Sequence, residues 1–479
     1  LLDDTTKNSF ENYVNKLRKA IADRISSKME NPFAAIANGM MVGDASQINK
    51  DDFDIIRVSG IAHIIAISGM HIVCVVGMVF FATRFLLTRF SDFALRYNVK
   101  KVSALIAIVF SFIYLLISGS PVSAQRAFVM SSLVLSAIVF DRNSTPMRSI
   151  AISAIIILLI TPEAIMGASL QMSFAACVAL IASYEVSTKF FAHKFGRSFI
   201  AKSAIYIISV TFSTLVAGAA TAPFIIYHFN QFSTYSILAN IVCVPLSDFF
   251  IMPFGMISML LMPVGLDFIT LKPMEWGLVA MFNYAKYISE LPNASFFIPS
   301  FTSYGMSFVI VGGLILCFFN TRLRYVGLIA IIAGFTTLKD VRKPDIAIDK
   351  SGKFFVIKDE NENLYFSAKR IPKFAKGAWM QNLGINEFKT INELNSCDEN
   401  SCYITKARSA YVMFGEAQHK CKDADVVLNL SNQEYKCSNS NVIKKADLIE
   451  KGGHLIWLLK DGIKIKTVLE NRPKRIWNG

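Results

Sequence analysis

Long apolar stretches recur along this chain between about residue 59 and residue 338, and no other feature limits its possible folds as much. A helix of about 20 apolar residues is long enough to cross the hydrocarbon core of a bilayer. The stretches near that length are residues 59–82, 102–119, 123–141, 149–161, 165–183, 203–228, 234–265, 275–291, 304–319 and 325–338. They predict an all-α polytopic membrane domain over residues 55–338.

The longest stretch, residues 234–265, exceeds the length of one span and contains Pro245, Asp248 and Pro253. Prolines and carboxylates interrupt a membrane helix. Such breaks are tolerated where the backbone is buried in protein or lines a wet cavity. We therefore expect one broken or re-entrant segment plus a single crossing in this stretch.

The basic residues of the connecting loops predict the number of crossings, because Lys and Arg collect in cytoplasmic loops. They occur in alternate loops of this chain, as Arg84, Arg89, Arg96, Lys100 and Lys101, then Arg142 and Arg148, then Lys189, Lys194, Arg197 and Lys202, then Lys272, and finally Arg322 and Arg324. About ten transmembrane helices put all these loops in the cytoplasm and both chain ends outside it. The same rule is one explanation of the net charge of +14, and a polyanionic substrate is another.

Residues 1–54 carry apolar residues at helical spacing between basic ones. This is typical of an amphipathic segment that lies on a membrane surface or packs on a neighbour, here outside the cytoplasm. The chain opens with Leu1 and has no apolar signal-peptide core there, so we expect a portion of the N-terminus to be missing.

Residues 339–479 are polar and charged, and they predict a small β-rich soluble C-terminal domain. The apolar residues 354–357 and 364–366 flank a polar segment, which is the pattern of a hairpin. Further strands are expected at residues 410–414, 425–430, 454–459 and 463–469.

Residues 59–72 read Ser-Gly-Ile-Ala-His-Ile-Ile-Ala-Ile-Ser-Gly-Met-His-Ile and place polar residues inside an apolar run. Four more unusual segments accompany it, namely Gly43-Asp44, residues 121–130 with Ser123 and Arg126, Leu170-Gln171-Met172-Ser173-Phe174, and Pro223 followed by Leu238-Ala239-Asn240 and Pro245-Leu246. In this order the five segments resemble the signature of the ComEC-type competence family. The most recognisable pattern of that family is Gly-x-x-His, four apolar residues, then Ser-Gly-x-His.

The resemblance spans residues 43–246 and implies a function. Members of the family are understood to pass one strand of incoming DNA across the cytoplasmic membrane. The chain is accordingly expected to be a multi-pass channel for single-stranded DNA in the bacterial inner membrane, with its tail outside the cytoplasm. The implied partners are single-stranded DNA, the lipid bilayer, an extracytoplasmic DNA receptor and a cytoplasmic helicase-like motor.

The sequence departs from full-length members of the family in two places. It begins too late to contain their N-terminal OB-like domain. Many members also end in a metallo-β-lactamase-like domain, whose His-x-His-x-Asp-His cluster holds two metal ions. Only His419 and His454 lie in the tail of this chain. We therefore expect no enzyme activity, no catalytic residue, no metal site and no cofactor.

Arg126 is the clearest candidate for a DNA contact, because a strand that crosses a bilayer needs cationic positions opposite its phosphates. The alternatives are that Arg126 reaches the membrane interface or pairs with a carboxylate. Asp248 is costly to bury and would repel phosphate, so it is expected to be paired, with Arg126 as the candidate partner.

His63 and His71 are eight residues apart and would lie near one helical face. With Ser68 they form a polar stripe that lines the pore or hydrogen-bonds to a neighbouring helix. Gln171 and Asn240 allow the same two interpretations.

Four of the eight cysteines lie in the tail, and they are Cys397, Cys402, Cys421 and Cys437. If the tail is outside the cytoplasm, the first two and the last two are expected to form disulfides. Free thiols are an alternative, as is a four-cysteine zinc site, for which the spacing is poor.

Other functions remain open from the sequence. One alternative is a transporter of another anionic solute, in which His63, His71 and Arg126 bind the anion. Another is a non-functional remnant of the channel. A membrane-embedded hydrolase is disfavoured, because the chain lacks a paired-carboxylate or His-rich metal motif.

Overall fold

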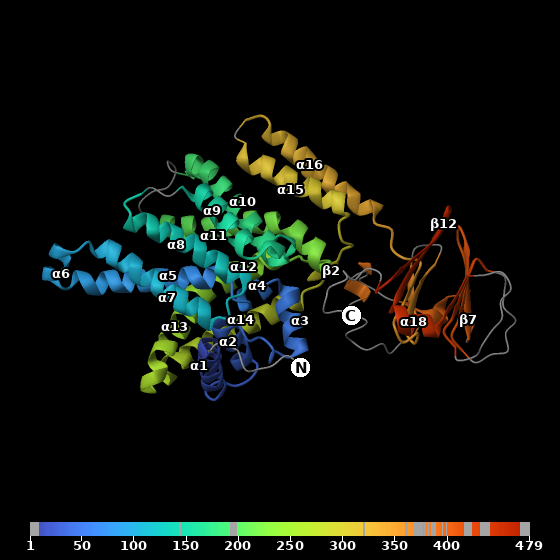
Figure 1. Cartoon of the computed structure of the whole chain (residues 1–479), viewed down its shortest axis with the longest axis horizontal. Coiled ribbons are helices and arrows are strands. Elements are labelled where there is room, and N and C mark those ends of the chain that lie inside the picture. The colour runs from blue at the N-terminus through green and yellow to red at the C-terminus, as the bar shows by residue number, and fades with distance from the viewer. Residues whose placement is uncertain are drawn as a thin grey trace. The chain divides into compact units, whose positions relative to one another are not determined.

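The structure, a computed structural model, describes residues 9–142, 145–191, 199–319, 321–359, 363–367, 377, 379–381, 383–384, 389–394, 396–398, 400–415, 424–431 and 441–469. The chain divides into a helical unit, Leu1–Phe296 with Ser303–Phe335, and a tail unit, Phe297–Thr302 with Thr336–Gly479. Figure 1 shows coiled ribbons throughout the first unit and arrows gathered in the second. The predicted contrast between a helical domain and a β-rich C-terminal region is confirmed.

The helical unit is built from helices of very unequal length. They are α1 Ser9–Ser26, α2 Phe33–Val42, α3 Lys50–Ser59, α4 Ala62–Ile65, α5 Gly69–Thr88, α6 Ser91–Arg96, α7 Val99–Ile117, α8 Val122–Val139, α9 Pro146–Ile160, α10 Ala168–Phe191, α11 Phe199–Phe229, α12 Ser236–Leu246, α13 Met252–Leu261, α14 Phe268–Ser289, α15 Ser303–Phe318 and α16 Arg324–Thr336. A π-helical segment, η3 Ser247–Ile251, joins α12 to α13. The break that the prolines predicted does not interrupt the helix: Ser236–Val264 is one helical run, and η3 is a wider turn within it.

Five helical segments of the described residues are long and apolar enough to cross a membrane, and they are Gly69–Thr88, Val99–Ile117, Val122–Val139, Ile208–Phe229 and Ser236–Val264. Shorter apolar helices include Pro146–Ile160, Ala168–Tyr184 and Ser303–Phe318. Large apolar side chains on these helices point outward, such as Phe81 at 67% exposure and Leu159 at 78%. Water would oppose such a surface and lipid tails would not.

The N-terminal segment, residues 9–60, is packed into the helical unit. α1 has the amphipathic pattern that the sequence predicts, but α2 is buried at nine of its ten positions. One apolar cluster joins Ile25 of α1, Met40 of α2, Cys243 of α12 and Leu278 of α14. This segment is thus part of the core of the unit.

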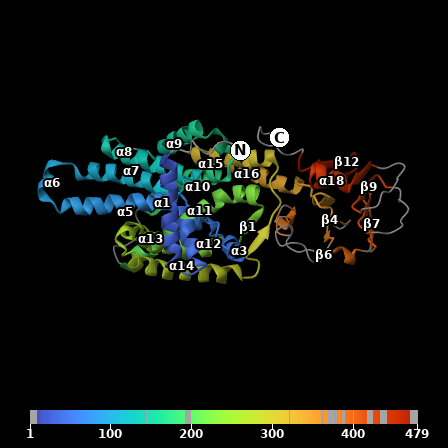
Figure 2. The ribbon, with the colours of Figure 1, turned by 60° about the horizontal axis from the view of Figure 1, so that its bottom comes forward.

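α5, α7 and α8 pack against one another, with α6 at the far end of the α5–α7 pair in both views (Figures 1 and 2). Their shared core includes Ile72, Tyr114 and Ala127. The loop between α7 and α8, residues 118–121, lies at the end of the pair opposite to α6, because α6 connects α5 to α7.

The tail unit contains two β-sheets. Their strands are β3 Ile346–Ile348, β4 Phe355–Lys358, β5 Leu364–Phe366, β6 Lys389–Thr390, β7 Ser401–Thr405, β8 Ser409–Met413, β9 Val426–Asn429, β10 Asn441–Lys444, β11 His454–Leu459 and β12 Gly462–Thr467. One sheet has the order β12-β11-β3-β4-β5-β6 and the other the order β10-β9-β8-β7. The predicted hairpin is confirmed, since Val356 pairs with Phe366 across antiparallel β4 and β5.

The two sheets of the tail share one apolar core. Ile357 and Ile456 come from the six-stranded sheet, and Val412 and Leu428 come from the four-stranded one. In the smaller sheet β8, β9 and β10 run parallel. β9 lies between β8 and β10, and a central parallel strand is buried on both faces, which explains why residues 426–429 are all buried.

Candidate functional site

The polar run 59–72 is not one helix. α3 ends at Ser59, α4 holds only four residues, and α5 begins at Gly69 after a non-helical connection at residues 66–68. The prediction that His63 and His71 share one helical face is therefore wrong. His63 lies on α4, before the break, and His71 lies in the first turn of α5.

The His71 ring caps the start of α5, directly after the break. The Ser68 N–H donates to Nδ1 of His71 at 3.0 Å, and the Ser68 hydroxyl lies 3.1 Å from the same nitrogen. A nitrogen that accepts a backbone N–H carries no proton, so the neutral ring carries its proton on Nε2. Nε2 is buried without a partner among the described residues. The helical unit therefore contains a buried N–H donor that has no acceptor among the described residues.

His63 has a different environment. Its ring is exposed, and Nδ1 lies 3.1 Å from the Gly60 carbonyl oxygen. Of the two histidines in the polar run, His71 caps a helix and His63 has an exposed side chain.

The break at residues 66–68 is where other segments of the predicted signature meet. The Ser123 hydroxyl of α8 donates to the Ile67 carbonyl at 2.7 Å. Gly43 also lies here: its φ is +77°, and a Cβ on it would lie 2.6 Å from the Ser118 carbonyl oxygen and 3.2 Å from the Ile67 side chain. Only glycine fits such a position. The sequence had not identified these roles of Ser123 and Gly43.

Arg126 is the charged group at the centre of this region. Only 3% of the residue is exposed. Its Nη1 donates to the Ser169 carbonyl at 3.2 Å and its Nη2 to the Ser123 carbonyl at 3.4 Å, while the Phe174 ring lies 5.5 Å from Cζ. Carbonyl oxygens and a ring face carry only partial negative charge. The full charge of the guanidinium is thus uncompensated within the described part of the chain.

The predicted ion pair between Arg126 and Asp248 does not form between these two described residues. Asp248 lies in η3, next to α5, where its backbone carbonyl is 3.8 Å from Sγ of Cys74. Its Oδ1 is buried without a partner in the described part of the chain, as is the hydroxyl of Ser247.

Gln171 and Asn240 differ in how they are satisfied. The Gln171 amide nitrogen donates to the Ile165 carbonyl at 2.9 Å, and its Oε1 lies 2.8 Å from Nε2 of His228. Gln171 therefore joins α10 to the end of α11. Oδ1 of Asn240 on α12 is buried and has no partner among the described residues.

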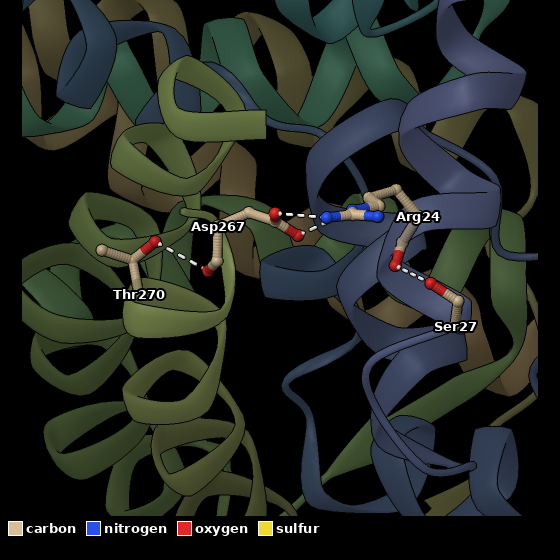
Figure 3. A network of polar contacts seen from close by, with 4 residues as sticks. All are labelled: Arg24, Ser27, Asp267 and Thr270. Carbon is tan, nitrogen blue, oxygen red and sulfur yellow. Dashed lines mark hydrogen bonds and ion pairs between the residues drawn. The ribbon is translucent and has the colours of Figure 1, made fainter. Parts of the chain in front are cut away.

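A second polar contact, absent from the sequence predictions, involves α1 and the start of α14. Arg24 donates from Nε and Nη2 to the two carboxylate oxygens of Asp267, at 3.0 and 2.8 Å (Figure 3). The side chain of Asp267 is fully buried and that of Arg24 is 40% exposed. The hydroxyls of Ser27 and Thr270 bond to the backbone carbonyls of Arg24 and Asp267, respectively.

In the tail, Cys397 and Cys402 form a disulfide. Cys421 and Cys437 lie outside the described residues. His454 is buried, with Nδ1 2.8 Å from the Gly452 carbonyl oxygen. A search of the described residues finds no group of three or more His, Cys, Asp or Glu side chains placed to hold a metal ion.

The helical unit thus combines a capped break between short helices, a buried arginine and several unsatisfied polar atoms. The family model for the competence protein matches residues 40–323, which is more than half of the chain. The chain therefore belongs to the competence protein family, and it is a transmembrane protein.

One relative is ComE operon protein 3 of Bacillus subtilis (strain 168). It is 27% identical over 261 residues, which are 54% of this chain and 30% of that protein. The chain therefore spans less than a third of the length of this curated relative. No solved structure matches the chain.

Proposed function

We propose that the helical unit is a channel that passes single-stranded DNA through the cytoplasmic membrane during DNA uptake. The observation that carries this proposal is Arg126, a buried cation with two backbone carbonyls as its hydrogen-bond acceptors. A buried charge without a countercharge is costly, and in membrane proteins it marks a substrate or ion pathway. A phosphate of the DNA backbone supplies the missing negative charge.

The position of His71 supports the same function. Its Nε2–H is a donor without an acceptor among the described residues. His71 follows directly on the break at residues 66–68, where the Ser123 hydroxyl of α8 donates to the Ile67 carbonyl. Unsatisfied donors inside a membrane protein require water or a ligand oxygen. A strand of DNA, with its water, offers both.

The proposed topology follows the basic loops, with the tail outside the cytoplasm. The disulfide between Cys397 and Cys402 supports this side, because disulfides persist in oxidising compartments. The charge pattern alone counts ten crossings, as α5, α7 to α11, α12 with α13, α14, α15 and α16. The channel itself has no nuclease role in this proposal, and a receptor outside and a motor inside supply capture and force.

The main rival is a transporter of a smaller anion, which would use the same buried arginine. The two differ in what competes for the site. A small-anion transporter is inhibited by that anion and does not need a polymer, whereas a DNA channel internalises label from DNA of many lengths.

The test is complementation in a transformable bacterium that lacks its own competence channel. Labelled duplex DNA is followed into the cytoplasm with the unaltered protein and with Arg126→Ala, at equal membrane abundance. Uptake by the first and its loss in the second are expected. Absence of uptake by abundant, correctly inserted protein would refute the proposal and favour the other transporter or a remnant.

A further inference from the structure

The N-terminal segment contacts three places in the helical unit. The Arg18 guanidinium lies beside the α7–α8 loop, where a Cβ on Gly119 would be 2.6 Å from its Nη2. The Arg57 carbonyl accepts from the hydroxyl of Ser233, just before α12. Arg24 holds Asp267, at the turn between α13 and α14 (Figure 3). The ten-crossing count puts the first two places outside and the third in the cytoplasm.

These positions conflict with the size of a bilayer. Arg18 and Arg24 are six residues apart on one helix, or about 9 Å along its axis at 1.5 Å per residue. An arginine side chain reaches about 7 Å, at about 1.5 Å per bond. Even with both side chains stretched in opposite directions, the two guanidinium groups on α1 are at most about 23 Å apart. The hydrocarbon core alone is about 30 Å thick, and about 40 Å or more with its headgroups.

The direction of α1 tightens this limit. In Figures 1 and 2 α1 runs across the axes of α5 and α7. If α5 and α7 cross the membrane, α1 lies along it, and its length adds little to the depth that it can bridge. The turn at Asp267 is therefore at nearly the same depth as Gly119.

The segment from α12 to α14 is here called the α12–α14 hairpin (residues 234–294). Its two chain ends lie on the same side of the membrane as its turn at Asp267. Its ends are tied together, since the Thr234 N–H donates to the Ala294 carbonyl at 3.0 Å and the Thr234 hydroxyl to the Asn293 carbonyl at 2.9 Å. Buried positions follow α14 from Thr270 to Ile288, within the cluster that α1 and α2 also form. The hairpin thus extends along the N-terminal segment for its whole length.

Although Ser236–Val264 is one of the five segments long and apolar enough to cross a membrane, we infer that the α12–α14 hairpin does not cross it, and that its tied chain ends and its turn at Asp267 both lie on the outer side. Eight crossings remain: α5, α7, α8, α9, α10, α11, α15 and α16. Arg322 and Arg324 stay in the cytoplasm and the tail stays outside. Of the basic positions used in the crossing count, only Lys272 changes sides; it lies near the start of α14, and its charge is paired with Glu275 at 2.6 Å. This inference needs a membrane but no particular solute.

The outer position also accounts for the polar atoms of η3. The Ser247 hydroxyl and Oδ1 of Asp248 are buried and lack partners among the described residues. Water that enters from the outer face can satisfy them, whereas hydrocarbon cannot.

The test is cysteine labelling in spheroplasts with a membrane-impermeant maleimide. In a chain whose native cysteines are replaced by serine, single cysteines are placed at three exposed positions. Lys272→Cys tests the hairpin, Glu163→Cys is the outer reference and Arg96→Cys is the inner reference. We expect Lys272→Cys and Glu163→Cys to react in intact spheroplasts, and Arg96→Cys to react only after permeabilisation.

The opposite result is equally clear. If Lys272→Cys reacts only after permeabilisation, together with Arg96→Cys, the hairpin crosses the membrane and the inference is wrong. If Lys272→Cys is unreactive in both states, Val264→Cys, at a position 70% exposed in the same turn, decides by the same criterion. DNA uptake is not measured, so this result and that of the complementation test are independent.

Discussion

Two regions of the helical unit each contain an arginine, and they treat its charge in opposite ways. Arg24 is partly exposed and holds both oxygens of a buried carboxylate, that of Asp267. Arg126 is almost fully buried and contacts two carbonyls and one aromatic ring. The first arrangement pairs both charges within the protein, and the second leaves the Arg126 charge without a carboxylate among the described residues.

The contrast separates a structural ion pair from a candidate ligand site. A buried charge that only stabilises a fold is normally paired, because an unpaired one costs free energy. Where the charge remains open, a binding partner from outside the chain explains its retention. The following changes test that distinction, in order of expected effect.

Arg126→Ala should reduce DNA uptake by about 10- to 100-fold, because a hydrogen bond from a charged donor contributes about 1.5–3 kcal/mol. Uptake is measured as protected label per cell at equal membrane abundance. Arg148→Ala, at an exposed position in the first turn of α9, is the matched control and should retain uptake. Equal uptake by both variants would show that Arg126 does not contact the DNA during uptake.

Arg24→Ala should lower the thermal midpoint of the purified full-length protein by roughly 5 °C. The change leaves the carboxylate of Asp267 buried without its partner, which costs more than the pair contributes. The double variant Arg24→Ala with Asp267→Asn should recover most of the loss. A double variant no more stable than the single one would show that the pair is not the cause.

His71→Ala should lower the thermal midpoint by roughly 3 °C, since loss of a helix cap costs about 1 kcal/mol. His63→Ala should leave it unchanged, because the exposed His63 ring makes a single hydrogen bond among the described residues, with the Gly60 carbonyl. Scanning fluorimetry of both variants measures the difference. If His63→Ala is the more damaging change, the capping role assigned to His71 is wrong.

Asp425→Asn should have the smallest effect, and that effect should depend on pH. Hydrogen bonds from the backbone N–H and hydroxyl of Ser409, with Arg408 adding to them, hold the pKa of the Asp425 carboxyl below its ordinary 3.8. The stabilisation is therefore complete above the ordinary pKa and is lost as pH falls through the lower folded-state pKa. Hydrogen exchange of β8 and β9 should show a difference between the two proteins that shrinks from about pH 6 to about pH 3. A constant difference would contradict this.

Much of the architecture could be predicted from the sequence, because periodicity and composition are local properties. The apolar runs marked the helices, and the two apolar runs 354–357 and 364–366 around a polar segment marked a real hairpin. The order of the signature segments also predicted the family. The break at residues 66–68 was missed, as was the ring after it that turns back to accept from Ser68. A helical wheel does not contain that information.

Contacts between distant segments were the other omission. The sequence offered Asp248 as a partner for Arg126, because both were charges in apolar runs. The structure instead satisfies Asp267, a residue in a predicted loop, with an arginine 243 positions away. A single sequence gives no distance between such segments. The crossing count used only the sign of each loop, and therefore treated Lys272 like the strongly basic loops.

The separation of Arg24 and Asp267 also has a consequence for how the chain is made. At about 5–20 residues per second, a ribosome needs roughly 12–50 s to synthesise the 243 residues between them. During that interval the apolar α2 and Arg24 of α1 lack their contacts with α14, while the first membrane helices are already being inserted. The nascent N-terminal segment should thus be the part of the protein most accessible to chaperones and proteases, and its protection should begin when α14 leaves the ribosome.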